Sequence, residues 1–305
     1  SHFERNGAKD PLTRRALSST KVMTNWAMRN VVQAWLDKHP GVTPDGWDSR
    51  ELLEPSKDDG TRTFDDEGDV GVLRTWRAMC PELQERWPEA ARPDCWEGVW
   101  MENGRVVKLE LEGFGLTGAV PAEIGRLSAL RLLSLADNEL TSVPAEIGLL
   151  ASLECLDLGL NQLTRVPAEI GQLTSLEVLW LYNNKLTSLP TEIGQLTSLR
   201  KMSLTGNQLT SVPMEIWQLT SLTWLDLDDN LLTSLPAEIG QLTSLTYLKL
   251  IGNQLTSLPA EIGQLTSLTY LNIIGNQLTS VPAAIRELIT AGCDVFVDAD
   301  VTVDE

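Results

Sequence analysis

The fold is decided by a repeated unit that reads Leu245-Thr-Tyr-Leu-Lys-Leu-Ile-Gly-Asn253-Gln-Leu255-Thr-Ser-Leu-Pro-Ala-Glu-Ile-Gly-Gln-Leu265-Thr-Ser267. The unit recurs with a period of 23 residues. Its register is marked by the asparagines Asn138, Asn161, Asn184, Asn207, Asn230, Asn253 and Asn276. A further first unit, from Val106 to Leu127, is one residue longer and has Phe114 at the asparagine position. This self-similarity predicts a stack of eight units.

Each part of the unit favours a particular conformation. The L-x-x-L-x-L core predicts a short strand whose leucines point inward. The asparagine lies where the chain turns, and its buried amide can satisfy backbone groups there. The Pro-Ala-Glu-Ile run predicts a short helical turn on the return segment. One unit cannot bury its own apolar face, so stacked units must share a core. The expected fold class is α/β, a solenoid with a concave parallel sheet and short helical turns on the convex side.

The pattern L-x-x-L-x-L-x-x-N-x-L resembles the leucine-rich-repeat (LRR) family, whose members are horseshoe-shaped solenoids. The resemblance extends over about residues 106–297. We place the eight units at residues 106–288. Gly292-Cys-Asp-Val-Phe-Val297 has the pattern of a final strand. Residues 289–305 are therefore predicted to form a C-terminal cap with an acidic tail, because exposed solenoid ends need caps.

Residues 71–105 are predicted to form the N-terminal cap. Cys95-Trp-Glu-Gly-Val99 resembles the cap of plant-type LRR proteins, and Leu116-Thr-Gly-Ala-Val-Pro121 resembles their L-x-G-x-x-P variant. The segment from Val72 to Arg86 is expected to supply a small helix in front of the repeats. Its inner face would carry the apolar residues Leu73, Trp76 and Met79.

A second resemblance lies in residues 2–36, within an N-terminal segment that we place at residues 1–42. Residues 2–36 contain Asp10-Pro-Leu-Thr-Arg14-Arg-Ala-Leu17, then Asn25, and then a helical pattern with Met28, Val31, Val32 and Trp35 on one face. This arrangement resembles the second half of a U-box, the zinc-free relative of the RING finger in ubiquitin ligases. The resemblance implies docking of a ubiquitin-conjugating enzyme (E2), with Arg14 and Leu17 on or near the second E2-facing loop. The first E2-binding loop is expected upstream of Ser1, so this chain is expected to be a poor ligase.

The net charge is strongly negative and unevenly distributed. The formal charge is −18, yet residues 1–42 carry +4 and the remaining residues carry −22. Residues 43–70 hold ten acidic and three basic residues and are predicted to form an acidic linker. An acidic body repels phosphate backbones, so nucleic acid is not an expected partner. A protein or peptide with basic residues is favoured instead.

Catalytic and metal-binding patterns are missing from the sequence. The two histidines, His2 and His39, have no metal-ligand or triad context. The cysteines Cys80, Cys95, Cys155 and Cys293 are widely spaced, which favours free thiols in a reducing, cytoplasmic compartment. No apolar run approaches the ~20 residues that span a bilayer, so no membrane contact is expected. We expect no cofactor and no catalytic residue in the repeats.

Comparison of the units with one another separates scaffold from variation. The return segment is nearly identical throughout, whereas the outward strand positions vary. The residue before the second core leucine (methionine in one unit) runs Lys108, Leu132, Cys155, Val178, Lys201, Trp224, Tyr247, Tyr270, and the residue after it runs Glu110, Ser134, Asp157, Trp180, Ser203, Asp226, Lys249, Asn272. Equivalent positions on adjacent strands lie about 4.8 Å apart. Trp224, Tyr247 and Tyr270 are therefore predicted to form a continuous aromatic row.

Charged and aromatic neighbours complete the predicted protein-binding face. Trp180 and Tyr182 should lie on the N-terminal side of the row. The face comprises Asp157, Trp180, Tyr182, Trp224, Asp226, Asp228, Tyr247, Lys249 and Tyr270, with Asp229 at its border. Aromatic anchors with charged neighbours are typical of binding hot spots, and an Arg or Lys of the partner would add cation–π and ionic contacts. The alternative is that the rings pack on one another and stabilise the sheet. Trp217, in place of the usual glycine, is interpreted as a packing substitution.

Three functions remain open. The first is an interaction scaffold that binds a protein or peptide on the concave face. The second is the substrate-recognition part of a U-box ubiquitin ligase, which a complete U-box upstream of Ser1 would favour. The third is a secreted receptor-type ectodomain, which a disulfide between Cys80 and Cys95 would favour.

Overall fold

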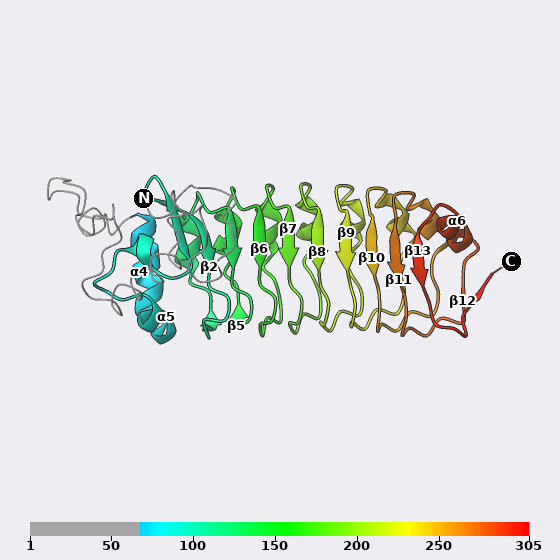
Figure 1. The fold of residues 1–305 in the computed structure, drawn as a ribbon, viewed down its shortest axis with the longest axis horizontal. Helices are drawn as coiled ribbons and strands as arrows, with labels where there is room; N and C mark the ends of the chain where they lie inside the picture. Colours follow the sequence, from blue (N-terminus) through cyan, green and yellow to red (C-terminus); the bar gives the residue numbers. More distant parts are fainter. Residues whose placement is uncertain (1–67, 305) are drawn as a thin grey trace, which may run out of the picture.

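The computed structural model describes residues 68–304 as a single row of stacked units (Figure 1). Within these residues the main sheet has ten strands in the order β1-β2-β4-β6-β7-β8-β9-β10-β11-β13. Their bounds are β1 Val99–Glu102, β2 Arg105–Glu110, β4 Leu132–Ser134, β6 Cys155–Asp157, β7 Val178–Trp180, β8 Lys201–Ser203, β9 Trp224–Asp226, β10 Tyr247–Lys249, β11 Tyr270–Asn272 and β13 Asp294–Phe296. β1 and β2 are antiparallel, and the other neighbours are parallel. The predicted LRR solenoid is confirmed.

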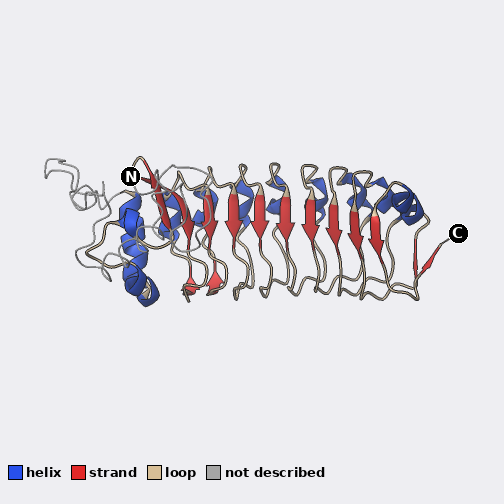
Figure 2. Ribbon diagram, viewed as in Figure 1, coloured by secondary structure: helices blue, strands red, loops and turns tan. Residues whose placement is uncertain are grey.

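Short 3-10 helices form a layer behind the sheet (Figure 2). They are η2 Ala122–Arg126, η3 Ala145–Leu149, η4 Ala168–Gln172, η5 Thr191–Gln195, η6 Met214–Gln218, η7 Ala237–Gln241 and η8 Ala260–Gln264. Each begins directly after a proline in extended conformation, such as Pro167, and buries an isoleucine, such as Ile170. Successive helices pack so closely that a Cβ on Gly171 would lie 2.3 Å from the carbonyl oxygen of Glu192. The predicted helical turns on the outer side are therefore present, and glycine sets their spacing.

The asparagines join each unit to the one before it. Oδ1 of Asn207 accepts the backbone N–H of Leu186 at 3.0 Å, and Nδ2 donates to the carbonyls of Leu181 and Leu204 at 2.9 Å each. The same pattern recurs from Asn138 to Asn276. The first unit has no earlier repeat to bond, so an apolar residue can take its place. Phe114 is buried there, beneath the Arg86 guanidinium, which lies 4.3 Å from the ring centroid.

The N-terminal cap contains two helices where the sequence predicted one. α4 (Asp69–Met79) and α5 (Pro81–Arg86) are separated by Cys80 in extended conformation, because Pro81 cannot continue the first helix. Leu73 and Trp76 are buried as predicted. The prediction for Met79 was wrong: its side chain is 61% exposed, because α4 ends at that residue. A short 3-10 helix, η1 (Pro93–Cys95), follows.

The beginning of α4 is anchored to the first repeat strand. The buried carboxylate of Asp69 accepts the backbone N–H of Val106 at 2.8 Å and pairs with Arg105, with 3.0 Å between Oδ2 and Nε. Asp69 and Val70, the last residues of the predicted linker 43–70, thus belong to this helix. Residues 43–67 of that linker and the U-box-like segment 1–42 lie outside the described residues.

The C-terminal end is closed by a different set of elements. α6 (Ala284–Thr290) replaces the 3-10 helix of the repeats, and β13 forms the final strand within the predicted 292–297 segment. Two small parallel pairs, β3 (Thr117–Ala119) with β5 (Glu139–Ser142) and β12 (Ser280–Val281) with β14 (Thr302–Val303), lie outside the main sheet. A single apolar core runs from Val72 in the N-terminal cap to Cys293 in the C-terminal cap.

Candidate functional site

The outward positions of neighbouring strands lie in register. Tyr247 on β10 pairs with Trp224 on β9 and with Tyr270 on β11, whereas Leu248 beside it is fully buried. Successive residues of a strand point to opposite faces, so the leucines fill the core and their neighbours line the other face. The variable positions therefore share one surface, the concave face of the solenoid.

Three aromatic rings stack along this face. The ring centroids of Trp224 and Tyr247 are 6.0 Å apart with an interplanar angle of 10°. Those of Tyr247 and Tyr270 are 4.1 Å apart with an angle of 11°. The structure thus brings the three predicted rings into one continuous row. The rings also pack on one another across strands, as expected if their role is to stabilise the sheet.

The row extends beyond these three rings at both ends. Trp180 on β7 meets Trp224 edge to face at 5.2 Å, across the small, buried Ser203 of β8. At the other end the Phe296 ring lies 5.2 Å from Tyr270 and is 42% exposed. Phe296 was not predicted as a site residue, because β13 lies outside the asparagine register. We call these five rings, Trp180, Trp224, Tyr247, Tyr270 and Phe296, the aromatic row.

Beside the row, Lys249 joins two buried aspartates. Its Nζ lies 3.5 Å from Oδ2 of Asp226 and 3.7 Å from Oδ2 of Asp228. Asp228 also accepts the backbone N–H of Ile251 at 2.6 Å. Burial and the neighbouring Asp226 raise the pKa of Asp228 to about 6, against the lowering effects of Ile251 and Lys249. Asp226, Asp228 and Lys249 therefore form an internally paired cluster, while Asp229 is exposed beside it.

Tyr182 lies towards the N-terminal side of the row, as predicted, with Asp157 beside it. The Tyr182 ring covers Gly159, where an added Cβ would lie 2.3 Å from Cε1 of the ring. Burial, together with Asp157, Glu112 and Asp137, raises the pKa of the Tyr182 hydroxyl. Burial and Glu112 also raise the pKa of Asp157, although Asp157 accepts the backbone N–H of Gly159. This end of the face is therefore rich in negative charge.

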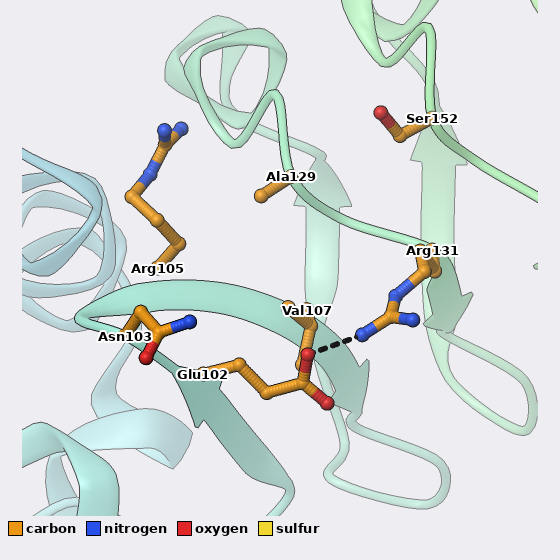
Figure 3. A pocket seen from close by; sticks show the side chains of 7 residues that line it. All are labelled: Glu102, Asn103, Arg105, Val107, Ala129, Arg131 and Ser152. Carbon is orange, nitrogen blue, oxygen red and sulfur yellow. Dashed lines mark hydrogen bonds and ion pairs between the residues drawn. The ribbon is translucent and has the colours of Figure 1, made fainter.

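A hollow at the N-terminal end of the sheet is a weaker candidate. Its volume is about 340 Å³, and it is lined by Glu102, Asn103, Arg105, Val107, Ala129, Arg131 and Ser152 (Figure 3). Arg131 is paired with Glu102 at 2.5 Å, and Arg105 is paired with Asp69. Since both guanidinium groups already have carboxylate partners, the hollow offers little unpaired charge to a ligand. In residues 68–304 no group of three acidic, histidine or cysteine side chains is placed to hold a metal ion.

Family models match both parts of the chain. The model for a leucine-rich repeat region matches residues 105–210 and 179–254, and a model for two leucine-rich repeats matches residues 243–286. The U-box domain model matches residues 1–41. Arg14 and Leu17 fall within that match but outside the described residues, so their role in E2 binding stays a prediction.

Similar solved structures are LRR proteins. A leucine-rich-repeat protein of Leptospira interrogans is 46% identical, covering 63% of this chain and 48% of its own, with a TM-score of 0.59. The Arabidopsis receptor kinase HAESA, solved with the peptide hormone IDA and the co-receptor SERK1, is 27% identical, covering 77% and 42%, with a TM-score of 0.68. The LRR receptor-like serine/threonine-protein kinase EFR of Arabidopsis thaliana is 39% identical over 87 residues, 26% of this chain and 8% of that protein. The chain thus spans less than half the length of each.

These findings define the class of protein. The chain is a leucine-rich-repeat protein with a U-box-like N-terminal segment, and its repeat region is a protein-interaction scaffold. Among the helices in the described residues, none has the length and apolar character required to cross a membrane.

Proposed function

We propose that this protein binds a protein or peptide ligand across its concave face, through the aromatic row and its charged neighbours. The aromatic row itself is the observation that carries the proposal: its five rings lie at outward positions of the sheet. Partly exposed aromatic side chains bury large areas at a small entropic cost, which is why they anchor interfaces. The HAESA structure, solved with a peptide hormone, offers a precedent on the same fold.

The test compares two triple variants in affinity capture from a source-cell lysate, followed by mass spectrometry. Trp180→Ala, Trp224→Ala and Tyr247→Ala remove the middle of the aromatic row. The matched control changes Gln195, Gln218 and Gln241, exposed residues of the outer 3-10 helices, to alanine. Partners that the control retains and the row variant loses, at equal thermal stability, support the concave face. Partners retained equally by both variants would place the binding site elsewhere.

A second candidate function is favoured by the U-box match over residues 1–41. In this reading the repeats select a substrate for ubiquitination, and the N-terminal segment docks an E2. The test measures binding of the chain to a panel of E2 enzymes by biolayer interferometry. Weak binding that Leu17→Ala abolishes, with partner capture by the concave face unchanged, supports the ligase role. E2 binding that is insensitive to both Arg14→Ala and Leu17→Ala would leave a plain adaptor.

The cellular compartment distinguishes the scaffold and ligase functions, which are intracellular, from the secreted receptor function. We propose a cytoplasmic protein, because Cys80 is a thiol in the structure. Burial raises the pKa of that thiol, which lowers its reactivity as a thiolate. Mass spectrometry of the protein from its natural source, without reduction, tests this proposal. An alkylated Cys80 supports the cytoplasmic reading, and a disulfide between Cys80 and Cys95 supports the secreted receptor.

A further inference from the structure

Ring stacking determines which part of the aromatic row a ligand can reach. Tyr247 has a near-parallel ring on each side, Trp224 and Tyr270, and Nζ of Lys249 lies over its ring, so the faces of Tyr247 already have partners within the protein. An aromatic ring is negative on its face and positive at its edge. A cation binds over the face, whereas an apolar or aromatic side chain can pack against edges. The middle of the aromatic row therefore favours apolar ligand groups over cations.

The carboxylates of the cluster beside the aromatic row share one lysine. Lys249 lies within 3.7 Å of both Asp226 and Asp228, and its Nζ also lies 5.9 Å from the Tyr247 ring centroid. Two exposed apolar side chains, Ile274 at 38% and Phe296 at 42%, continue the surface towards the C-terminal cap. A ligand cation placed at this cluster would meet Lys249 together with the two carboxylates with which Lys249 is already paired. Asp226, Asp228 and Lys249 together keep one formal negative charge, and the exposed Asp294 lies opposite Tyr270, so this part of the face combines exposed apolar groups with a small negative charge.

The N-terminal part of the same face differs, because three of its carboxylates have no lysine partner in the described residues. Asp137 and Asp157 both lie at Gly159, beneath the Tyr182 ring: the backbone N–H of Asp137 donates to the Gly159 carbonyl at 3.0 Å, and Oδ1 of Asp157 accepts the Gly159 N–H at 2.9 Å. Glu112 acts electrostatically on the Tyr182 hydroxyl together with these two aspartates. Within residues 68–304 none of the three has a salt bridge, and the nearby Lys108 is held by Glu110 at 2.6 Å. Glu112 and Asp137 are exposed, so they can still take a cationic partner. We call Glu112, Asp137, Asp157 and Tyr182 the acidic end of the face.

Charge complementarity and this division select one kind of occupant. On the basis of the proposed concave-face binding, we propose that the ligand is an extended basic–apolar polypeptide segment that crosses the strands. Its cationic side chain lies against the acidic end, and its apolar side chains pack on Tyr247, Tyr270 and Phe296. Lys201 on β8, between the two ends, disfavours a second cation in the middle.

The sheet fixes the length of this segment. Asp157 is on β6 and Phe296 is on β13, and six strand spacings separate the two strands. At about 4.8 Å per spacing the path is roughly 29 Å long. An extended chain advances about 3.3 Å per residue, so roughly nine residues are needed. Tyr247, on β10, is four spacings from β6, so the cationic and apolar side chains of the ligand should be about six to nine residues apart.

The experiment is a selection of random 12-residue peptides displayed on phage against the full chain. Enriched peptides are synthesised with a fluorophore, and their affinities are measured by anisotropy. The expected peptides have Arg or Lys at one end and Trp, Phe, Leu or Ile at the other, about six to nine residues away. The double variant Tyr247→Ala/Tyr270→Ala, which removes two rings of the aromatic row, should abolish their binding. Neutralising the acidic end with Glu112→Gln/Asp137→Asn/Asp157→Asn should weaken it about tenfold and reduce its salt dependence.

A control variant carries the same change of charge on the outer helices, Glu192→Gln/Glu238→Gln/Glu261→Gln, and should bind like the wild type. Peptides that need the aromatic row but are indifferent to the acidic end would overturn the basic–apolar ligand and leave the proposed function standing. Peptides that bind equally well to the wild type and to the double variant Tyr247→Ala/Tyr270→Ala would overturn the proposed function itself. A selection without enrichment would count against both.

Discussion

The ring of Tyr182 lies directly on Gly159 of the neighbouring strand unit: a Cβ at Gly159 would come 2.3 Å from both Cε1 and Cζ of the ring. The backbone of Gly159 does not have a positive φ, so glycine is needed there for space and not for its conformational freedom. This contact holds Tyr182 beside Asp157, at the boundary between the acidic end and the aromatic row.

Gly159→Ala should therefore destabilise the protein by about 1–3 kcal/mol, because the new methyl group must displace the ring. In a Tyr182→Ala background the same change should cost little, since the obstructing ring is gone. Urea denaturation of the wild type, both single variants and the double variant gives the coupling free energy. Additive costs would show that Gly159 and Tyr182 do not depend on each other.

Particular residues show how far the sequence could predict this structure. The asparagine register predicted which side chains share the concave face, because the strands pair one unit with the next: Tyr247 lies opposite Trp224 as the repeat requires. Phe296 escaped the prediction, because the C-terminal cap has no asparagine to mark its register. The break between α4 and α5 was missed, although Pro81 is a recognised helix breaker inside the predicted segment.

Other properties of the face depend on distances that a repeat pattern does not contain. Asp226 and Asp228 were predicted to border the row as partners for a basic ligand, but they are buried and Lys249 pairs with both. The sequence places Lys249 next to Asp226, yet it does not show which carboxylates remain unpaired. Ring orientation is likewise a matter of packing, and it determines whether Tyr247 presents a face or an edge.

Asp228 predicts a pH dependence of stability. Its pKa is raised from 3.8 to about 6 in the folded state. The folded state thus binds this proton more tightly than the unfolded state, so this group makes the protein less stable as the pH rises from about 4 to about 6. The cost is fully present above about pH 6 and has an order of magnitude of 3 kcal/mol.

Asp228→Asn should accordingly be more favourable, relative to the wild type, at about pH 7.5 than at about pH 4. The asparagine Oδ1 can still accept the N–H of Ile251. Chemical denaturation at the two pH values measures the difference. Asp298→Asn is the matched control, because Asp298 follows β13 and its carboxyl is less buried than that of Asp228. A pH-independent effect of Asp228→Asn would show that the pKa of Asp228 is not raised.

The asparagines from Asn138 to Asn276 join successive units, so loss of any one of their amides should lower the free energy of unfolding. Asn184 accepts the N–H of Leu163 at 3.0 Å and donates to the carbonyls of Leu158 and Leu181 at 2.9 and 3.2 Å. Asn184→Ala leaves these buried groups without partners, so the free energy of unfolding should fall by about 3 kcal/mol. Thermal and urea denaturation measure the loss. The exposed Lys185→Ala is the control, and an equal effect of both changes would contradict the role of the amide.

Substitutions of Trp217 compare the effect of the repeat's usual glycine with the effect of a buried indole on stability. Trp217 stands where other units have glycine, such as Gly194 and Gly240, it is fully buried, and its Nε1 is the one buried side-chain nitrogen or oxygen without a hydrogen-bond partner in residues 68–304. Trp217→Phe keeps most of the volume and removes the unpaired donor, so stability should be unchanged or higher. Trp217→Gly restores the repeat residue but leaves a cavity, so it should cost about 3–5 kcal/mol in urea denaturation. If Trp217→Gly were stabilising instead, close stacking of the outer helices would outweigh the packing of the indole.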